Sequence, residues 1–228
     1  MVDAVPTATS DDSTDALIAA LQLRGVAEPV IDGRRLRAER GRAAVVAATL
    51  RLIDEGDPLP SYAAVAAAAG LSERTVFRYF PDREALFGAV ASEVFPRIAH
   101  CLTLEPVAGD VRTRAVALVA LRGELADHTA GLARAVERAA PTSRLGAALV
   151  AVRNERLLEQ VQAWFTDELV AAPSGAAAAV DVLLGTASIS RLRELLPADH
   201  VAGALVEATV RLLAPAERTV ASRPGEHT

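Results

Sequence analysis

The side chains best suited to chemical recognition lie in one short stretch of this chain, Glu73–Tyr79, with the sequence ERTVFRY. The stretch combines arginine, threonine and aromatic residues at positions that are not required for packing in the core. Arginine can bond to two acceptors of guanine or hold a phosphate, and threonine and aromatic rings can contact thymine methyl groups. These residue types therefore indicate contacts with double-stranded DNA.

The residues before this stretch predict the elements that position it. Ser61 is suited to cap a helix over Tyr62–Ala69, and Gly70 can adopt the left-handed conformation of a tight turn. Ser72 is suited to cap a second helix over Glu73–Tyr79. Two short helices joined by a glycine turn are typical of a helix-turn-helix, whose second helix enters the major groove.

Helical periodicity divides the side chains of the second helix. Val76 and Phe80, four residues apart, are expected to face the core with Leu71. An arginine-rich segment, 34–42, either lies over DNA phosphates or simply begins a solvated helix. The alternative for the whole region is an ordinary surface of a helical bundle. The predicted DNA contacts are Arg42, Ser61, Tyr62, Glu73, Arg74, Thr75, Phe77, Arg78, Tyr79 and Arg83.

The rest of the chain is helical in pattern and predicts an all-α fold. Alanine and leucine dominate, aromatic residues make up only 4%, and an apolar fraction of 51% suffices for a large core. Gly131 is expected to end one helix and Pro96 to kink or end another. The expected helices span 15–23, 37–55, 62–69, 73–79, 83–103, 111–128, 130–139, 142–170, 175–195 and 198–214.

Charge and residue composition argue against several kinds of site. The net charge is −5, but residues 34–83 hold nine arginines against six acids, which is a local +3. All 24 basic residues are arginine, so Schiff-base and phosphate-loop lysines are excluded. Cys101 is the single cysteine, so neither an intrachain disulfide nor a cysteine-based zinc site is expected to be possible. His100 adjoins it without a further clustered ligand in the sequence, so no metal or cofactor is expected.

No feature of the sequence suggests catalysis, secretion or membrane insertion. There are no paired carboxylates and no nucleophile with a base, although a small all-helical enzyme or a helical protein-interaction module remains an alternative. The N-terminus is acidic and polar, unlike a signal peptide, and no run approaches the ~18 uncharged apolar residues of a membrane helix. A cytoplasmic protein without enzymatic activity or membrane contacts is expected.

One ordered motif extends through the helix-turn-helix and beyond it: Ala63-x-Val65-Ala66-x-x-Ala69-Gly70-Leu71-Ser72-x-x-Thr75-Val76-Phe77-x-Tyr79-Phe80-Pro81-Asp82-Arg83-Glu84-Ala85-Leu86-Phe87. On these residues, about a quarter of the chain, residues 40–90, resembles the DNA-binding domain of the tetracycline-repressor (TetR) family of bacterial regulators. The resemblance implies that Arg83 binds a phosphate, where the family usually has lysine, and that Phe77 replaces a frequent tyrosine. It also implies groove-facing positions at Glu73, Arg74, Thr75, Phe77 and Tyr79.

The resemblance further implies a homodimeric repressor that a small-molecule effector releases from a palindromic operator. The expected organisation is an arm (1–33), a helix-turn-helix domain (34–83), an effector-binding and dimerisation domain (84–214) and a tail (215–228). Candidate effector-pocket residues are Leu121, Arg122, Leu125, Val152, Val161, Trp164 and Phe165. Candidate dimer contacts, which could equally close a bundle within one chain, are Val180, Leu183, Leu184, Ala187, Val201, Leu205 and Leu212.

Overall fold

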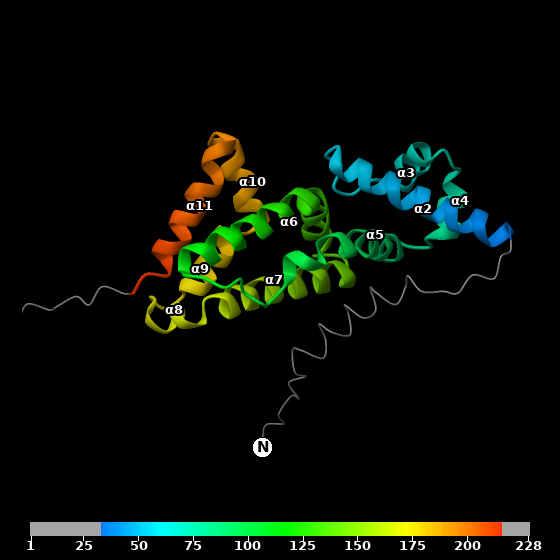
Figure 1. Cartoon of the computed structure of the whole chain (residues 1–228). Coiled ribbons are helices and arrows are strands. Elements are labelled where there is room, and N and C mark those ends of the chain that lie inside the picture. The colour runs from blue at the N-terminus through cyan, green and yellow to red at the C-terminus, as the bar shows by residue number, and fades with distance from the viewer. Residues whose placement is uncertain (1–32, 216–228) are drawn as a thin grey trace, which may run out of the picture. The chain divides into compact units, whose positions relative to one another are not determined.

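The computed structural model describes residues 33–215, so the expected helix 15–23, the arm before residue 33 and the tail beyond 215 lie outside it. The described residues form α-helices and one 3-10 helix, without a strand, which confirms the expected all-α fold (Figure 1). The helices are α2 (Gly33–Asp54), α3 (Tyr62–Ala69), α4 (Glu73–Tyr79), α5 (Arg83–Ile98), η1 (Ala99–Leu102), α6 (Val111–Ala139), α7 (Arg144–Trp164), α8 (Thr166–Ala171), α9 (Ala176–Leu183), α10 (Thr186–Leu195) and α11 (Ala198–Leu212).

The chain divides into two compact units. Within the described residues, the first comprises 33–102 and Glu124–Arg156, and the second comprises Thr103–Gly123 and 157–215. Helices α6 and α7 each continue from one unit into the other. All the predicted DNA-contacting residues belong to the first unit.

One cluster of buried apolar side chains holds α2, α3, α4 and α5 together. Val45, Val65, Val76 and Val90, one from each helix, are fully buried in it. Phe80, at the end of α4, is buried in the same cluster, and this confirms the expected inward face of that helix. A seven-residue helix is unstable alone, so α4 depends on this burial for its helical form.

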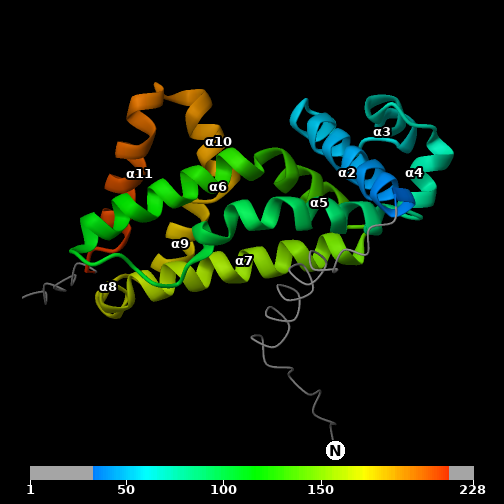
Figure 2. The same cartoon turned by 45° about the vertical axis from the view of Figure 1, so that its right-hand side comes forward.

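In the first unit, α5 lies between the parts of α6 and α7 that belong to that unit (Figure 2). Phe87 of α5 is buried with Ile53 of α2 and with Ala135 of α6. Glu84 Oε1 accepts a hydrogen bond from Arg144 N at 2.8 Å, at the first residue of α7. A carboxylate at a helix N-terminus bonds a free amide and is favoured by the helix dipole.

The expected helix end at Gly131 is wrong, because α6 runs unbroken through this residue. A Cβ at Gly131 would lie 2.9 Å from Asp54 Oδ1 and 3.1 Å from Ile53 Cγ2. The glycine therefore serves close packing of α6 against the end of α2. A glycine in a helical sequence can either end the helix or allow a neighbouring element to pack closely against it. Only the position of that neighbouring element shows which of the two roles applies.

Two expected long helices are each split in the structure. The expected helix 142–170 is divided at Phe165. The backbone of this residue leaves the helical conformation, with φ −126° and ψ 31°, and its side chain is buried. The expected helix 175–195 is divided at Gly185, which has extended φ −67° and ψ 148° before α10. At this second break Val182 O, near the end of α9, accepts from Gly185 N at 3.2 Å and from Ser188 Oγ at 2.6 Å.

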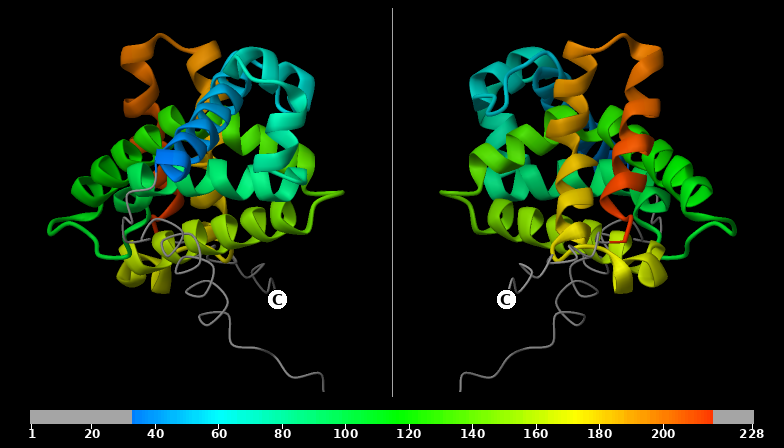
Figure 3. Two further views of the ribbon diagram at one scale, coloured as in Figure 1. Left: turned by 90° about the vertical axis from the view of Figure 1, so that its right-hand side faces the viewer. Right: turned by 90° about the vertical axis from the view of Figure 1, so that its left-hand side faces the viewer.

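Helices α9, α10 and α11 pack together in the second unit, with α11 beside the other two (Figure 3). Each contributes buried apolar side chains, among them Val180, Ile189 and Leu205. The spacing of Val201, Leu205 and Thr209 at every fourth position gives α11 one buried stripe.

Helix α5 is rich in apolar side chains. With η1 it is long and apolar enough to cross a membrane by length and composition. Its apolar side chains, including Leu86, Phe87 and Val90, are buried in the protein, which accounts for them without a bilayer. Pro96 lies inside α5, which continues past it to Ile98 and then tightens into η1.

Candidate DNA-binding site

Side-chain caps and one glycine fix the geometry of the helix-turn-helix. Ser61 Oγ accepts from Ala64 N at 3.1 Å, and Ser72 Oγ accepts from Thr75 N at 3.2 Å. Gly70, between α3 and α4, has φ 66° and ψ 31°, a left-handed conformation that glycine adopts without steric cost. These are the caps and the turn that the sequence predicts.

One face of α4 is exposed, and we call it the outer face of α4. It consists of Glu73, Arg74, Phe77 and Arg78, all exposed, while Val76 on the opposite side is fully buried. Positions i, i+1, i+4 and i+5 of a helix share one side, so these four residues form a continuous surface. The Phe77 side chain is 47% exposed, an unusual position for a phenylalanine in a folded domain.

Tyr62 supports the outer face of α4 from below. Its ring stacks on Phe77 with 4.2 Å between the ring centroids and 2° between the planes. Its hydroxyl donates to Phe80 O at 3.1 Å, and only 8% of the residue is exposed. Burial, and then the charge of Asp82, raise the pKa of this phenol, partly opposed by Arg83. The sequence suggested a phosphate contact for Tyr62, whereas in the structure its hydroxyl bonds within the protein.

The C-terminal end of α4 is attached to α2. Arg42 Nη1 donates to Tyr79 O at 2.5 Å, and its guanidinium lies 4.4 Å from the centre of the Phe80 ring. A Cβ at Gly41 would lie 2.5 Å from the Tyr79 hydroxyl oxygen, so the glycine leaves room for the Tyr79 ring against α2. Gly41 is a positioning residue that sequence reasoning missed, because its role depends on a partner 38 positions away.

The other predicted contacts differ in how accessible they are. Ser61 and Arg83 are exposed, and Arg83 Nη1 lies 3.5 Å from Pro60 O. Thr75 and Tyr79 are half-buried, and Thr75 Oγ1 lies 2.8 Å from Ser72 Oγ in a hydrogen bond. Seven of the predicted DNA-contacting residues are thus exposed, namely Arg42, Ser61, Glu73, Arg74, Phe77, Arg78 and Arg83.

A short capped helix that carries arginines and an aromatic ring on its outer face, locked to a preceding helix, defines a helix-turn-helix DNA-binding domain. Residues 45–90 match the family model described as "Bacterial regulatory proteins, tetR family". This DNA-binding domain belongs to the TetR family, and the protein is a DNA-binding transcription regulator. A comparison with curated protein sequences finds no match.

The candidate effector-pocket residues fall in both units. Leu125 and Val152 belong to the first unit, and the other five belong to the second. Arg122, Leu125, Val161, Trp164 and Phe165 are buried, and Leu121 and Val152 are half-buried. A cleft of about 350 Å³ in the first unit is lined by other residues: Ile53, Gly56, Pro58, Gly131, Arg134, Glu137 and Arg138.

Arg122 is the most buried charge of the described chain and bonds fully within the second unit. Its Nε donates to Gln160 Oε1 at 2.9 Å, its Nη2 donates to Leu157 O at 2.6 Å, and its Nη1 lies 3.2 Å from Asp181 Oδ1. Burial lowers the pKa of the guanidinium, and the Asp181 carboxylate opposes this effect. This cation joins α6, α7 and α9, and removal of one of its partners would leave a buried charge uncompensated.

The candidate dimer contacts are mostly internal to one chain. Val180, Leu184, Val201 and Leu205 are buried in the second unit without a partner subunit. Leu183 and Leu212 are half-buried, and Ala187 is exposed. Apolar side chains outside the candidate list are more accessible, with Val182 69% and Leu195 59% exposed.

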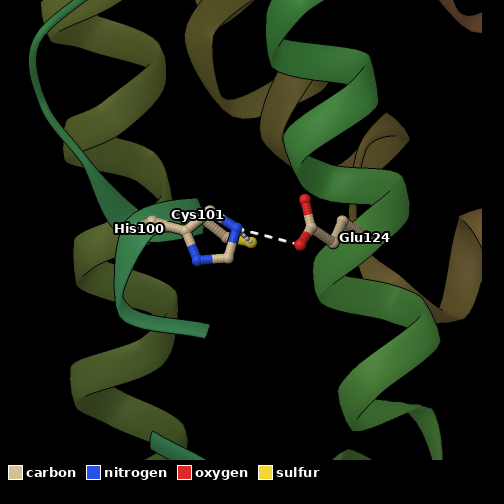
Figure 4. A group of neighbouring side chains, drawn as sticks. All are labelled: His100, Cys101 and Glu124. Carbon is tan, nitrogen blue, oxygen red and sulfur yellow. Dashed lines mark hydrogen bonds and ion pairs between the residues drawn. The ribbon is translucent and has the colours of Figure 1, made fainter. Parts of the chain in front are cut away.

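The expectation that His100 and Cys101 have no further ligand beside them is wrong. Glu124 of α6 lies next to them in the first unit, with its Oε1 2.9 Å from His100 Nε2 (Figure 4). Burial, and then the charge of Glu124, raise the pKa of the Cys101 thiol to about 11. The sequence places 22 residues between Glu124 and Cys101, so no local motif could reveal this group.

Proposed function

We propose that this protein is a cytoplasmic repressor that binds a palindromic operator as a homodimer and releases it when a small-molecule effector binds. The outer face of α4 carries the DNA-recognition part of the proposal, because two arginines and an exposed ring stand there on a helix held by Val76 and Phe80. The two other parts of the proposal, the homodimer and the release by an effector, are inferred from the match of the DNA-binding domain to the TetR family.

The outer face of α4 suits the edges of base pairs. Arg74 and Arg78 reach guanine or a phosphate, and the Phe77 ring suits a thymine methyl group. Glu73, at the start of the helix, can accept from a cytosine amino group. Tyr62 acts beneath this face, because its stacking holds Phe77 in place.

Arginine and serine side chains around α4 suit the DNA backbone. Arg83 and Arg42 are exposed cations, and Ser61 stands at the N-terminus of α3 beside free backbone amides. A helix N-terminus and arginine side chains both favour phosphate. We assign these three residues to phosphate contacts, which fix the orientation of α4 in the groove.

The proposed dimer places two α4 helices in successive major grooves, about 34 Å apart. Residues 34–83 form the proposed DNA-binding domain, and residues 84–214 form the proposed effector-binding and dimerisation domain. Accessible residues of α9 to α11, such as Leu183, Val182 and Leu212, suit the subunit contact. An effector that prefers a different separation of the two α4 helices lowers operator affinity.

The test begins with selection of bound fragments from genomic DNA to obtain an operator. Arg78→Ala should then weaken operator binding at least fivefold, since a bidentate arginine–guanine pair contributes about 1–3 kcal/mol of discrimination. The control is Arg97→Ala, an exposed arginine of α5 paired with Glu93, which should bind like wild type. Circular dichroism checks that both variants remain helical.

Two results would overturn the proposal. If the selection enriches no sequence, the chain does not recognise an operator. If Arg78→Ala binds the operator as tightly as wild type, the outer face of α4 does not read the bases.

A further inference from the structure

Three side chains with metal-binding atoms meet in the first unit, away from the helix-turn-helix. His100 and Cys101 come from η1, and Glu124 comes from α6 (Figure 4). Their donor atoms all lie within 4.8 Å of one another. His100 Nε2 is 2.9 Å from Glu124 Oε1 and 3.4 Å from Cys101 Sγ.

Two of these separations, both from His100 Nε2, are close to those of a tetrahedral metal centre. Metal–ligand bonds of about 2.0–2.3 Å around zinc place neighbouring donor atoms roughly 3.3–3.7 Å apart. The distance of 3.4 Å from nitrogen to sulfur already fits, and the distance of 2.9 Å from nitrogen to oxygen needs a small increase. The His100 and Glu124 side chains are 53% and 46% exposed, so both can make that adjustment by side-chain rotation.

A fourth donor stands one helical turn away. His128 follows Glu124 by four positions on α6, and its Nε2 lies 4.0 Å from Glu124 Oε1. Side chains four positions apart share one face of a helix, the spacing by which helical metal motifs present two ligands. His128 lies outside the cluster of three donors, but its side chain is 48% exposed and can rotate toward it, so the group can offer one thiol, two imidazoles and one carboxylate to a four-coordinate ion.

From this juxtaposition we propose that His100, Cys101, Glu124 and His128 form a binding site for one divalent transition-metal ion of the zinc class. Thiolate and imidazole ligands favour zinc and exclude magnesium and calcium, which prefer oxygen. Binding forms a metal–sulfur bond and releases the thiol proton to solvent. Thiolate and carboxylate then carry two negative charges that balance the two positive charges of the ion.

The test uses the full chain, stripped of metal with a chelator and titrated with Co²⁺ as a spectroscopic probe. Wild type should show thiolate-to-cobalt charge-transfer absorption that saturates at one ion per chain, and Zn²⁺ should displace it. Mg²⁺ should not compete. These measurements involve no DNA, so their failure would leave the proposed repressor function untouched.

Single substitutions separate a metal site from a simple hydrogen-bonded group. Cys101→Ser should abolish the charge-transfer band, and His100→Ala and Glu124→Gln should each weaken Zn²⁺ binding by at least about tenfold. His200→Ala is the matched control, because His200 also lies beside a carboxylate, with its Nδ1 3.2 Å from Asp199 Oδ1. It should bind like wild type.

His100→Ala and Glu124→Gln alter exposed side chains, so these variants test the site even if Cys101→Ser fails to fold. Circular dichroism verifies that each variant is helical. Absence of the charge-transfer band in wild type, or equal Zn²⁺ affinity in wild type and these two variants, would overturn the proposal.

Discussion

At the scale of single residues, Tyr62 links the core of the DNA-binding domain to its surface. One side chain stacks on Phe77, bonds Phe80 O and is itself nearly buried. The exposed ring of Phe77 therefore has a fixed orientation, although nothing covers it from outside. A preorganised aromatic side chain loses little conformational entropy when it binds, so Tyr62 contributes to recognition through Phe77.

Tyr62→Phe separates this supporting role from a phosphate contact. Loss of the hydroxyl leaves Phe80 O without its partner, so the free energy of unfolding should fall by about 1 kcal/mol, measured by urea denaturation. The folded state raises the pKa of Tyr62 above 10.0, so this group contributes stability at lower pH that is lost as pH rises through the folded pKa. The variant should lack that part of the alkaline decline.

Operator affinity of Tyr62→Phe should equal that of wild type, because the hydroxyl bonds within the protein. Unchanged stability together with reduced operator affinity would instead assign the Tyr62 hydroxyl to DNA.

At the scale of elements, the contribution of a glycine within a helix to stability depends on which residues pack against it. Gly131 lies in the middle of α6 with Ile53 and Asp54 within 3.1 Å of a hypothetical Cβ. Gly203 lies in the middle of α11 with nothing within 4 Å of such an atom. Both lower helix propensity equally, so the difference between them reflects packing alone.

Substitution of these two glycines should therefore change stability in opposite directions. Gly203→Ala should raise the free energy of unfolding by up to about 1 kcal/mol, since alanine is the better helix former. Gly131→Ala should lower it, because overpacking costs about 1–3 kcal/mol and exceeds that gain. Thermal and urea denaturation measure both, and stabilisation by Gly131→Ala would contradict the close approach of α6 to α2.

At the scale of the whole molecule, the charge distribution decides how an acidic protein can bind DNA. The chain carries a net charge of −5, whereas residues 34–83 carry +3. Repulsion between DNA and the acidic residues outside this segment is screened beyond about 8 Å at physiological salt. The arginines near the DNA therefore dominate the electrostatic interaction at the contact. The protein as a whole should show little non-specific affinity, and recognition depends on the first unit.

Salt dependence measures the number of phosphate contacts in the proposed dimer. Operator affinity should fall linearly on a logarithmic plot against salt, and Arg83→Ala should make the slope shallower by about 2, one contact from each subunit. Arg191→Ala, which removes an exposed arginine of α10 paired with Glu194, should leave the slope unchanged. An unchanged slope for Arg83→Ala would remove Arg83 from the phosphate contacts.

The sequence by itself determined what depends on neighbours along the chain. The bounds of α3 and α4, their serine caps and the left-handed Gly70 follow from local propensity, because a cap and a turn involve residues at most a few positions apart. Periodicity also predicted the buried face of α4, with Val76 and Phe80. The family match at residues 45–90 agrees with the motif read from these residues.

Tertiary structure decided what depends on residues far apart in the chain. It directed the Tyr62 hydroxyl inward, placed Gly41 against Tyr79, carried α6 through Gly131 and brought Glu124 to His100 and Cys101. A glycine or a histidine has the same local propensity whatever it contacts. The outcome at these positions follows from which side chain the folded chain places opposite, and no periodicity encodes that pairing.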